Sequence, residues 1–188
     1  MRKVFLTFLF IFIFHVCSAP TMDFRLRMLK LRSLSEYYDR KHHESEFSRF
    51  INDLGFRESG NNWLSVNLIG CFGEYQFAES TLRYLGYKKI TLNNFKANPD
   101  IFPKGLQREV LKTLIKVNLC YLIDYEHYIG NSINGIIITK SGMIAASHLG
   151  GPGSLKKFLD SNGKIDLKDV LGTSIQDYLK KFCYYDLE

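Results

Sequence analysis

The chain has 188 residues, of which 46% are hydrophobic, 14% aromatic and 23% charged, with only 4 prolines. This composition excludes a disordered, collagenous or low-complexity protein and predicts one compact domain, or two at most. The formal net charge is +6, and it falls to +4 (23 basic and 19 acidic residues) if Arg2 and Lys3 are removed with a leader. Most of this excess lies in residues 20–43, and the nearly neutral body from Glu44 onward predicts no nucleic-acid partner.

Residues 1–19 have the pattern of a signal peptide. Arg2 and Lys3 form a cationic start, a largely apolar run covers residues 4–16, and small residues at 17–19 suit a signal peptidase. The run is shorter than the roughly 20 apolar residues of a membrane-spanning helix, although an uncleaved anchor is the alternative. We expect cleavage after Ala19, no stable membrane span afterwards, and a secreted or periplasmic protein.

Three cysteines follow the predicted leader, namely Cys71, Cys120 and Cys183. An odd number of cysteines allows at most one internal disulfide and leaves at least one thiol unpaired. So few cysteines do not make a disulfide scaffold, and we expect the stability of the domain to come from its apolar core.

Residues 24–32 mix apolar and basic side chains without a clean helical or strand period. We interpret residues 20–43, which include this segment, as a basic N-terminal arm, either solvated or lying on the domain or an anionic surface. From Glu44 the pattern becomes helical, with apolar residues at i, i+3, i+4 and i+7: Phe47, Phe50, Ile51 and Leu54. Glu58 continues this face, so its carboxylate is expected at the inner, C-terminal edge of a buried helix.

The remaining elements are mostly short helices. Gly86 is a plausible residue just after one helix end, and Pro103 suits the first turn of a longer helix. Thr173 and Gln176 predict a capping box before the last helix. The expected helices cover 77–85, 103–121, 141–149, 155–159 and 175–182, with a β-prone run at 136–138. The sequence therefore predicts a mainly α fold with at most a minor β element.

Several chemistries are not indicated. The histidines lack the H-E-x-x-H spacing and no C-x-x-C occurs, so we expect neither a metal site nor a cofactor. The glycines at 150–153 lack the frame of a phosphate-binding loop. Cys71 paired with His148 would make a cysteine peptidase or amidase, but Cys71 is more simply a small hydrophobe beside Phe72.

Three segments together resemble a known family. They are FRESGNN at 56–62, GEYQF at 73–77 and AASHLGGPG at 145–153. This set resembles the lysozyme-like lytic transglycosylases, in which a catalytic Glu in E-S-x-x-N precedes a Gln by eighteen residues. Here Glu58 and Gln76 have that separation, and Ser59 and Asn62 complete the first motif. The third motif departs from the family, since Ser147-His148 stands where many members have Tyr-Asn.

The resemblance implies a lysozyme-like (goose-type or SLT) helical domain over residues 44–188 that cleaves the MurNAc–GlcNAc β-1,4 bond of bacterial peptidoglycan. It implies Glu58 as the catalytic residue, with a 1,6-anhydroMurNAc product and no cofactor. We expect a monomer whose partner is the glycan strand. The expected substrate-binding residues are Ser59, Gly73, Tyr75, Gln76 and His148.

The chemistry of glycoside cleavage supports this choice of Glu58. A carboxyl can protonate a leaving oxygen near neutral pH if partial burial raises its pKa. Hydrolases add a second carboxylate, and Glu74 is the candidate here because it lies inside the second motif. A lysozyme-type hydrolase is therefore one alternative. A non-catalytic wall-binding protein with a degenerate cleft is the other, and the altered Ser147-His148 pair favours it.

Overall fold

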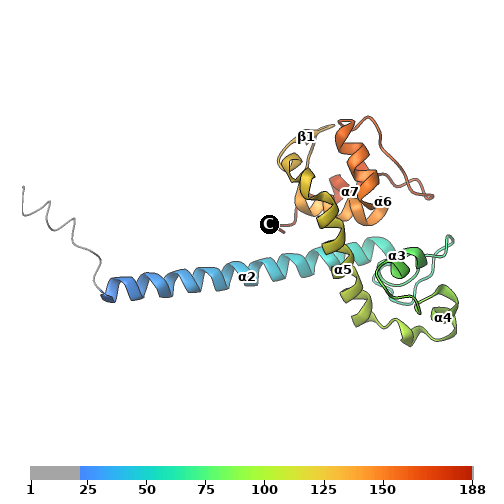
Figure 1. Ribbon diagram of the computed structural model, residues 1–188, viewed down its shortest axis with the longest axis horizontal. Helices are drawn as coiled ribbons and strands as arrows, with labels where there is room; N and C mark the ends of the chain where they lie inside the picture. Colours follow the sequence, from blue (N-terminus) through green and yellow to red (C-terminus); the bar gives the residue numbers. More distant parts are fainter. Residues whose placement is uncertain (1–21, 188) are drawn as a thin grey trace, which may run out of the picture. The chain divides into compact units, whose positions relative to one another are not determined.

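The computed structural model describes residues 22–187, with side chains from Arg25 onward (Figure 1). The predicted signal peptide lies outside the described residues. The fold is mainly α, as expected, with one small antiparallel sheet. Among residues 22–187, no helix combines the length and the apolar character needed to cross a membrane. The chain divides into two compact units, with the boundary between His42 and His43.

The described part of the first unit belongs to helix α2 (Met22–Ser59). The sequence analysis expects a helix only from Glu44, whereas α2 already begins at Met22. Residues 25–45 are all solvent-exposed, so intrinsic propensity rather than packing explains the helix. No Gly or Pro interrupts this stretch, which is rich in Leu, Arg and Lys, and Arg32 pairs with Glu36 one turn later at 3.0 Å.

In the second unit, the predicted apolar stripe of α2 enters the core. Phe50, Ile51 and Leu54 are buried, and Phe47 packs against the core as a partly buried residue. Phe50 meets Phe182 and Tyr185 edge-on, with ring centroids 5.8 and 5.3 Å apart. These contacts hold the C-terminal half of α2 against the end of the chain.

Three short helical segments and one long helix follow. They are α3 (Glu79–Tyr84), α4 (Leu92–Ala97), the 3-10 helix η1 (Pro99–Ile101) and α5 (Lys104–Leu122). Pro103 is the residue just before α5, as its fixed φ favours. The rings of Phe72, Phe77, Phe95 and Phe102 are buried and pack together, with centroids of contacting rings 4.9 to 6.4 Å apart.

A second 3-10 helix, η2 (Ile123–Tyr128), leads to the hairpin of β1 (Ser132–Ile133) and β2 (Ile136–Ile137). Ser132 pairs with Ile137, and Ile133 with Ile136. The turn residues Asn134 and Gly135 both have positive φ, of 51° and 75°, as a two-residue hairpin turn requires. The predicted β-prone run is thus one strand of the only sheet among the described residues.

Helix α6 (Lys140–Asp160) contains the two helices expected at 141–149 and 155–159. They are separated by a kink at Gly151, where φ is 74° and ψ is 162°, directly before Pro152. Helix α7 (Ile175–Lys181) packs against α6. Its capping box uses Ser174 and Asp177, one residue later than the predicted pair, because Ser174 is the residue whose side chain reaches the N3 amide.

Candidate active site

Glu58 lies in the last turn of α2, one residue before the helix ends. Its side chain is partly buried, and its Oε1 accepts a hydrogen bond of 2.5 Å from the hydroxyl of Tyr178 in α7. Burial, followed by the negative charge of Glu58, raises the pKa of Tyr178, so the phenol stays protonated and remains a donor at neutral pH. The hydroxyl of Tyr178 thus fixes the position of the Glu58 carboxylate.

A cleft of about 430 Å³ opens beside this carboxylate. It brings together three residues that the sequence assigned to the site, namely Glu58, Gln76 and His148. The described residues that complete its lining come from α2, the 67–71 turn, α6, the segment before α7, and α7 itself: Arg57, Asn67, Ile69, Cys71, Leu149, Asp169, Leu171, Thr173 and Tyr178. Glu58 and Asp169 are the carboxylates in this lining.

Gln76 reaches the cleft from a strained turn. Its φ is +50°, in the left-handed region that non-glycine residues rarely adopt, and its amide nitrogen donates to the Gly73 carbonyl at 2.7 Å. Its buried Oε1 has no hydrogen-bond partner within the described part of the chain. Buried acceptors without a partner are rare in folded proteins, and this one belongs to a residue that lines the cleft.

His148 connects the same turn to α6. Its Nε2 lies 2.9 Å from the carbonyl oxygen of Tyr75, and because a carbonyl can only accept, Nε2 must carry the proton. The ring also meets Phe77 edge-on at 6.1 Å. His148 therefore combines both roles weighed from the sequence, since it is anchored like a core residue and lines the cleft.

The other predicted site residues lie behind the cleft. Ser59, Gly73, Glu74 and Tyr75 are not among the cleft-lining residues. Glu74 is only 1% exposed, and its Oε1 lies 3.5 Å from the ammonium of Lys104. It therefore does not face the cleft, as the hypothesis of a second carboxylate at this position required. Tyr75 is fully buried as well.

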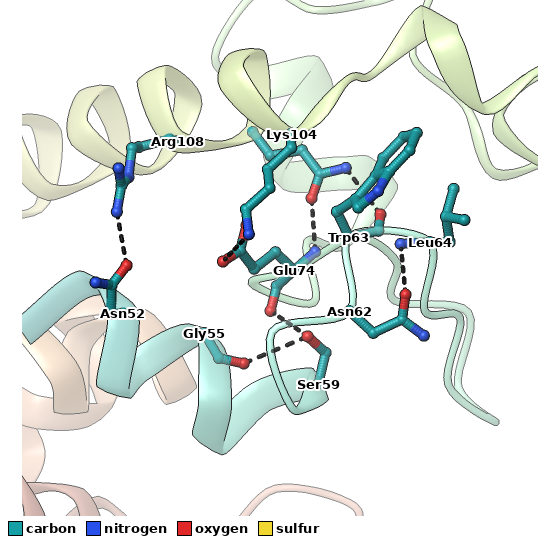
Figure 2. Close-up of polar contacts among 10 residues, drawn as sticks. Asn52, Gly55, Ser59, Asn62, Trp63, Leu64, Glu74, Lys104 and Arg108 are labelled. Carbon is teal, nitrogen blue, oxygen red and sulfur yellow. Dashed lines mark hydrogen bonds and ion pairs between the residues drawn. The ribbon is translucent and has the colours of Figure 1, made fainter.

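Ser59, Glu74 and Gln107 form a polar cluster together with the exposed Lys104, and we call these four residues the clamp. Figure 2 labels Ser59, Glu74 and Lys104. The hydroxyl of Ser59 donates to the carbonyl of Glu74 at 2.7 Å, and the amide of Glu74 donates to Gln107 Oε1 at 2.6 Å. Gln107 Nε2 donates to the carbonyls of Trp63 and Phe102 at 2.9 and 2.7 Å. The clamp joins the end of α2, the 73–76 turn and the start of α5.

Two glycines make the close packing around the clamp possible. A Cβ atom on Gly73 would lie 2.6 Å from Gln107 Oε1, and Gly73 also has a φ of +86°. A Cβ on Gly55, in the last turns of α2, would lie 2.7 Å from Asn61 and 3.0 Å from Glu74 Cγ. Both glycines therefore allow the backbone to lie close to other groups of the protein: the Gly73 backbone to the Gln107 side chain, and the Gly55 backbone to Asn61 and Glu74.

The cysteine-enzyme alternative finds no support in the geometry. Cys71 lines the cleft as a free thiol, and burial, the largest cause, raises its pKa, which disfavours the thiolate that a nucleophile needs. The Nε2 of His148 is bonded to Tyr75, and no hydrogen bond joins His148 to Cys71 within the described residues. Cys120 and Cys183 are also free thiols.

Sequence reasoning missed three residues of the site and its support: Asp169, Tyr178 and Gln107. Asp169 Oδ1 accepts from the amides of Leu171 and Thr173 at 2.9 and 2.7 Å, so a local turn presents it to the cleft. Gln107 was detectable in principle, because it lies one turn before Val110, on the apolar side of the helix expected at 103–121.

Comparison with known proteins finds no matching family model, and no curated protein or solved structure with significant similarity.

Proposed function

We propose that this protein is a peptidoglycan lytic transglycosylase with a lysozyme-like domain, in which Glu58 is the catalytic residue. The observation that carries the proposal is the joint placement of Glu58, Gln76 and His148 in one cleft. These residues come from three separate segments of the sequence, and they belong to the three motifs that resemble the family. A chance similarity of three short motifs would not explain why one side chain from each of them lines the same cleft.

In the proposed reaction Glu58 first acts as a general acid. Its carboxyl proton passes to the glycosidic oxygen while the bond from that oxygen to C1 of MurNAc breaks. The carboxylate then removes the proton of the C6 hydroxyl of the same sugar, and this oxygen bonds to C1 to give the 1,6-anhydro product. Tyr178 holds Glu58 in place through its hydroxyl. Both steps use one carboxylate, so no second acid is needed.

The amide of Gln76 and the imidazole of His148 are proposed to orient the sugar. The buried Oε1 of Gln76 and Nδ1 of His148 are both acceptors without a partner in the described chain. Hydroxyl and acetamido groups are donors of the kind that such acceptors bind. The proposed substrate lies outside the cytoplasm, which agrees with the expected signal peptide at residues 1–19.

Hydrolysis is the second candidate, and Asp169 is the observation that favours it. Only one oxygen of this carboxylate is engaged by the turn, through the Leu171 and Thr173 amides, and the side chain lines the cleft. A second carboxylate able to activate water would convert the same site into a lysozyme-type hydrolase. The burial of Glu74 leaves Asp169 as the residue on which this alternative depends.

Digestion of purified peptidoglycan, with mass spectrometry of the products, tests the proposal. Wild-type protein is expected to release anhydromuropeptides, 18 Da lighter than reducing-end muropeptides because cleavage consumes no water. Reducing-end products that disappear in an Asp169→Asn variant would instead establish hydrolysis. Binding to peptidoglycan without any release would favour the non-catalytic wall-binding alternative. Equal release by wild type and Glu58→Gln would overturn the catalytic assignment.

A further inference from the structure

The part of α2 that belongs to the first unit carries an unusual number of exposed apolar side chains. Figure 1 shows this stretch as one uninterrupted helix, and its residues are solvent-exposed from Arg25 onward. Five large apolar side chains within ten residues remain 48–63% exposed: Leu26, Met28, Leu29, Leu31 and Leu34. Apolar side chains that gather on an exposed surface mark an interaction site. The function proposed above makes no use of this helix.

One side of the helix carries most of this apolar surface. Met28, Leu31, Leu34 and Tyr38 follow one another at intervals of three or four residues, so they lie on the same side, and we call them the stripe. Leu26 and Leu29 lie on the opposite half, which is why the sequence as a whole shows no single apolar face. That half also carries a carboxylate, because Glu36 follows Leu29 by seven residues, or about two turns.

Basic side chains accompany the stripe. Residues 25–34 contain four basic residues and no acidic one. Two of them, Lys30 and Arg32, adjoin Leu31 in the sequence, so each projects about 100° to one side of it, and together they flank the stripe. Arg32 pairs with Glu36 at 3.0 Å, yet its side chain is still 79% exposed and within reach of a partner.

Charge and apolar character together define the class of partner. The basic residues attract anions, and the stripe gains free energy only from an apolar environment. A soluble anionic polymer supplies the charge without an apolar layer, and an uncharged apolar surface supplies no anion. The surface of an anionic lipid bilayer supplies both, since phosphates lie directly above the acyl chains. Long basic side chains can reach these phosphates while their helix lies at the boundary.

We propose that residues 25–38 of α2 bind the surface of a membrane that contains anionic lipids. The helix lies in the plane of the surface with the stripe toward the acyl chains, and Lys30 and Arg32 contact the lipid phosphates. This inference is independent of the proposed function, because it holds the chain at a membrane whatever reaction the second unit performs.

Co-flotation with lipid vesicles tests the proposal. The full protein is used as the expressing cell processes it, with vesicles of phosphatidylcholine alone or with about one third phosphatidylglycerol. Wild type is expected to partition onto the anionic vesicles at least about tenfold more strongly than onto the neutral ones. This preference is expected to decrease as salt is added, because salt screens exposed charges. Equal partitioning onto the two kinds of vesicle would overturn the proposal.

The role of charge is tested by combining Lys30→Gln with Arg32→Gln. One basic residue at an anionic surface contributes about fivefold in partitioning, so the pair is expected to lose about 25-fold on the anionic vesicles. The matched control combines Lys88→Gln with Lys89→Gln, which removes the same charge from exposed positions of the second unit and is expected to cost less than about twofold. Equal losses in the two pairs would show that net charge alone drives binding, against the assignment to α2.

The role of the stripe is tested by combining Leu31→Ser with Leu34→Ser. Its control is Leu26→Ser with Leu29→Ser, which makes the same change in composition and helix propensity at leucines of similar exposure, so that only the side of the helix differs. The stripe pair is expected to lose about tenfold in partitioning and the control pair less than about threefold. Circular dichroism verifies that both pairs keep the same helix content. Equal losses in both pairs, or no loss in the stripe pair, would contradict the proposal.

Two further measurements separate a membrane from other partners of the same helix. In sedimentation equilibrium without lipid, a dimer that is lost in the stripe pair, together with no binding to vesicles, would assign the stripe to a second copy of the chain and overturn the proposal. Binding to soluble polyphosphate as tight as to anionic vesicles, and insensitive to the stripe pair, would assign the helix to anionic polymers and overturn it as well. A monomer that binds the anionic vesicles more tightly than polyphosphate supports the proposal.

Discussion

Glu58 and Glu74 are sixteen residues apart, and each belongs to a motif that suggested chemistry. Glu58 is partly exposed to a cleft and is held by one phenol, at 2.5 Å. Glu74 is buried, faces the Lys104 ammonium, and has its main chain bonded to Ser59 on one side and Gln107 on the other. The same type of side chain thus occurs in two environments: Glu58 lies at a cleft that is open to a ligand, and Glu74 is enclosed by the protein.

This difference teaches that membership of a motif does not settle the role of a side chain. The second motif supplies the cleft with Gln76 only, while its Gly73, Glu74 and Tyr75 hold the turn in place. A catalytic group must reach the reacting atoms, and a positioning group must be out of their reach and rigid. The following predictions separate these two roles.

The largest expected effect comes from exchanging each glutamate for glutamine. Glu58→Gln keeps an acceptor for Tyr178 but removes the transferable proton, so release of soluble glycan from peptidoglycan is expected to fall by about 10³-fold. Glu74→Gln removes a charge from a closed site and is expected to leave activity within about threefold of wild type. Comparable losses in the two variants, at equal melting temperature, would mean that Glu74 also takes part in the reaction.

Gln107 tests the clamp directly. Gln107→Ala leaves the Glu74 amide and the carbonyls of Trp63 and Phe102 without their partner, and each buried unsatisfied group costs about 1–3 kcal/mol. We expect a loss of about 3 kcal/mol in the free energy of unfolding, measured by urea titration. The matched control is Gln76→Ala, which removes one main contact within its own turn and is expected to cost about 1 kcal/mol. Equal losses would show that the clamp has no special role.

Tyr178→Phe weakens the support of Glu58 without opening a cavity. The ring stays packed against Phe182, with centroids 5.4 Å apart, while the hydroxyl that donates to Glu58 is lost. A hydrogen bond to a charged group contributes about 1.5–3 kcal/mol, so kcat is expected to fall by roughly 10- to 100-fold while KM changes little. A change in KM alone would assign Tyr178 to substrate binding.

Much of the helical pattern was predictable from the sequence because it follows local rules. The apolar spacing of Phe50, Ile51 and Leu54, and the place of Pro103 before α5, need no tertiary information. The helix before Glu44 was missed because its side chains from Arg25 to Ser45 are exposed, so no apolar face marks it in the sequence. The position of the α7 cap was missed by one residue because Thr173 and Ser174 are both good capping residues.

A residue of the candidate site was predictable only where it belonged to one of the three motifs. The structure places Glu58, Gln76 and His148, one from each motif, in the lining of the cleft. Asp169 and Tyr178 line the cleft 111 and 120 positions after Glu58, and no local pattern in the sequence marks either as a partner of that glutamate. The burial of Glu74 depends on Lys104 and Gln107 of α5, which approach it only in the folded chain.

Asp177 extends the comparison to an exposed carboxylate with a structural role, and it gives the smallest expected effect. Its hydrogen bond from the Ser174 backbone, the largest cause, lowers its pKa below the ordinary value of 3.8. A pKa that is lower in the folded state stabilises the protein at pH values above the unfolded pKa, and this contribution is lost as the pH falls through the folded value. Since the side chain is exposed, we expect Asp177→Asn to cost only ~0.5 kcal/mol at pH 7 and to flatten the decline in stability below pH ~4. Urea unfolding at a series of pH values measures both the loss at pH 7 and the decline in stability at low pH. The control is Asp124→Asn, at another exposed aspartate. Identical pH profiles for the two variants would contradict this account of the α7 cap.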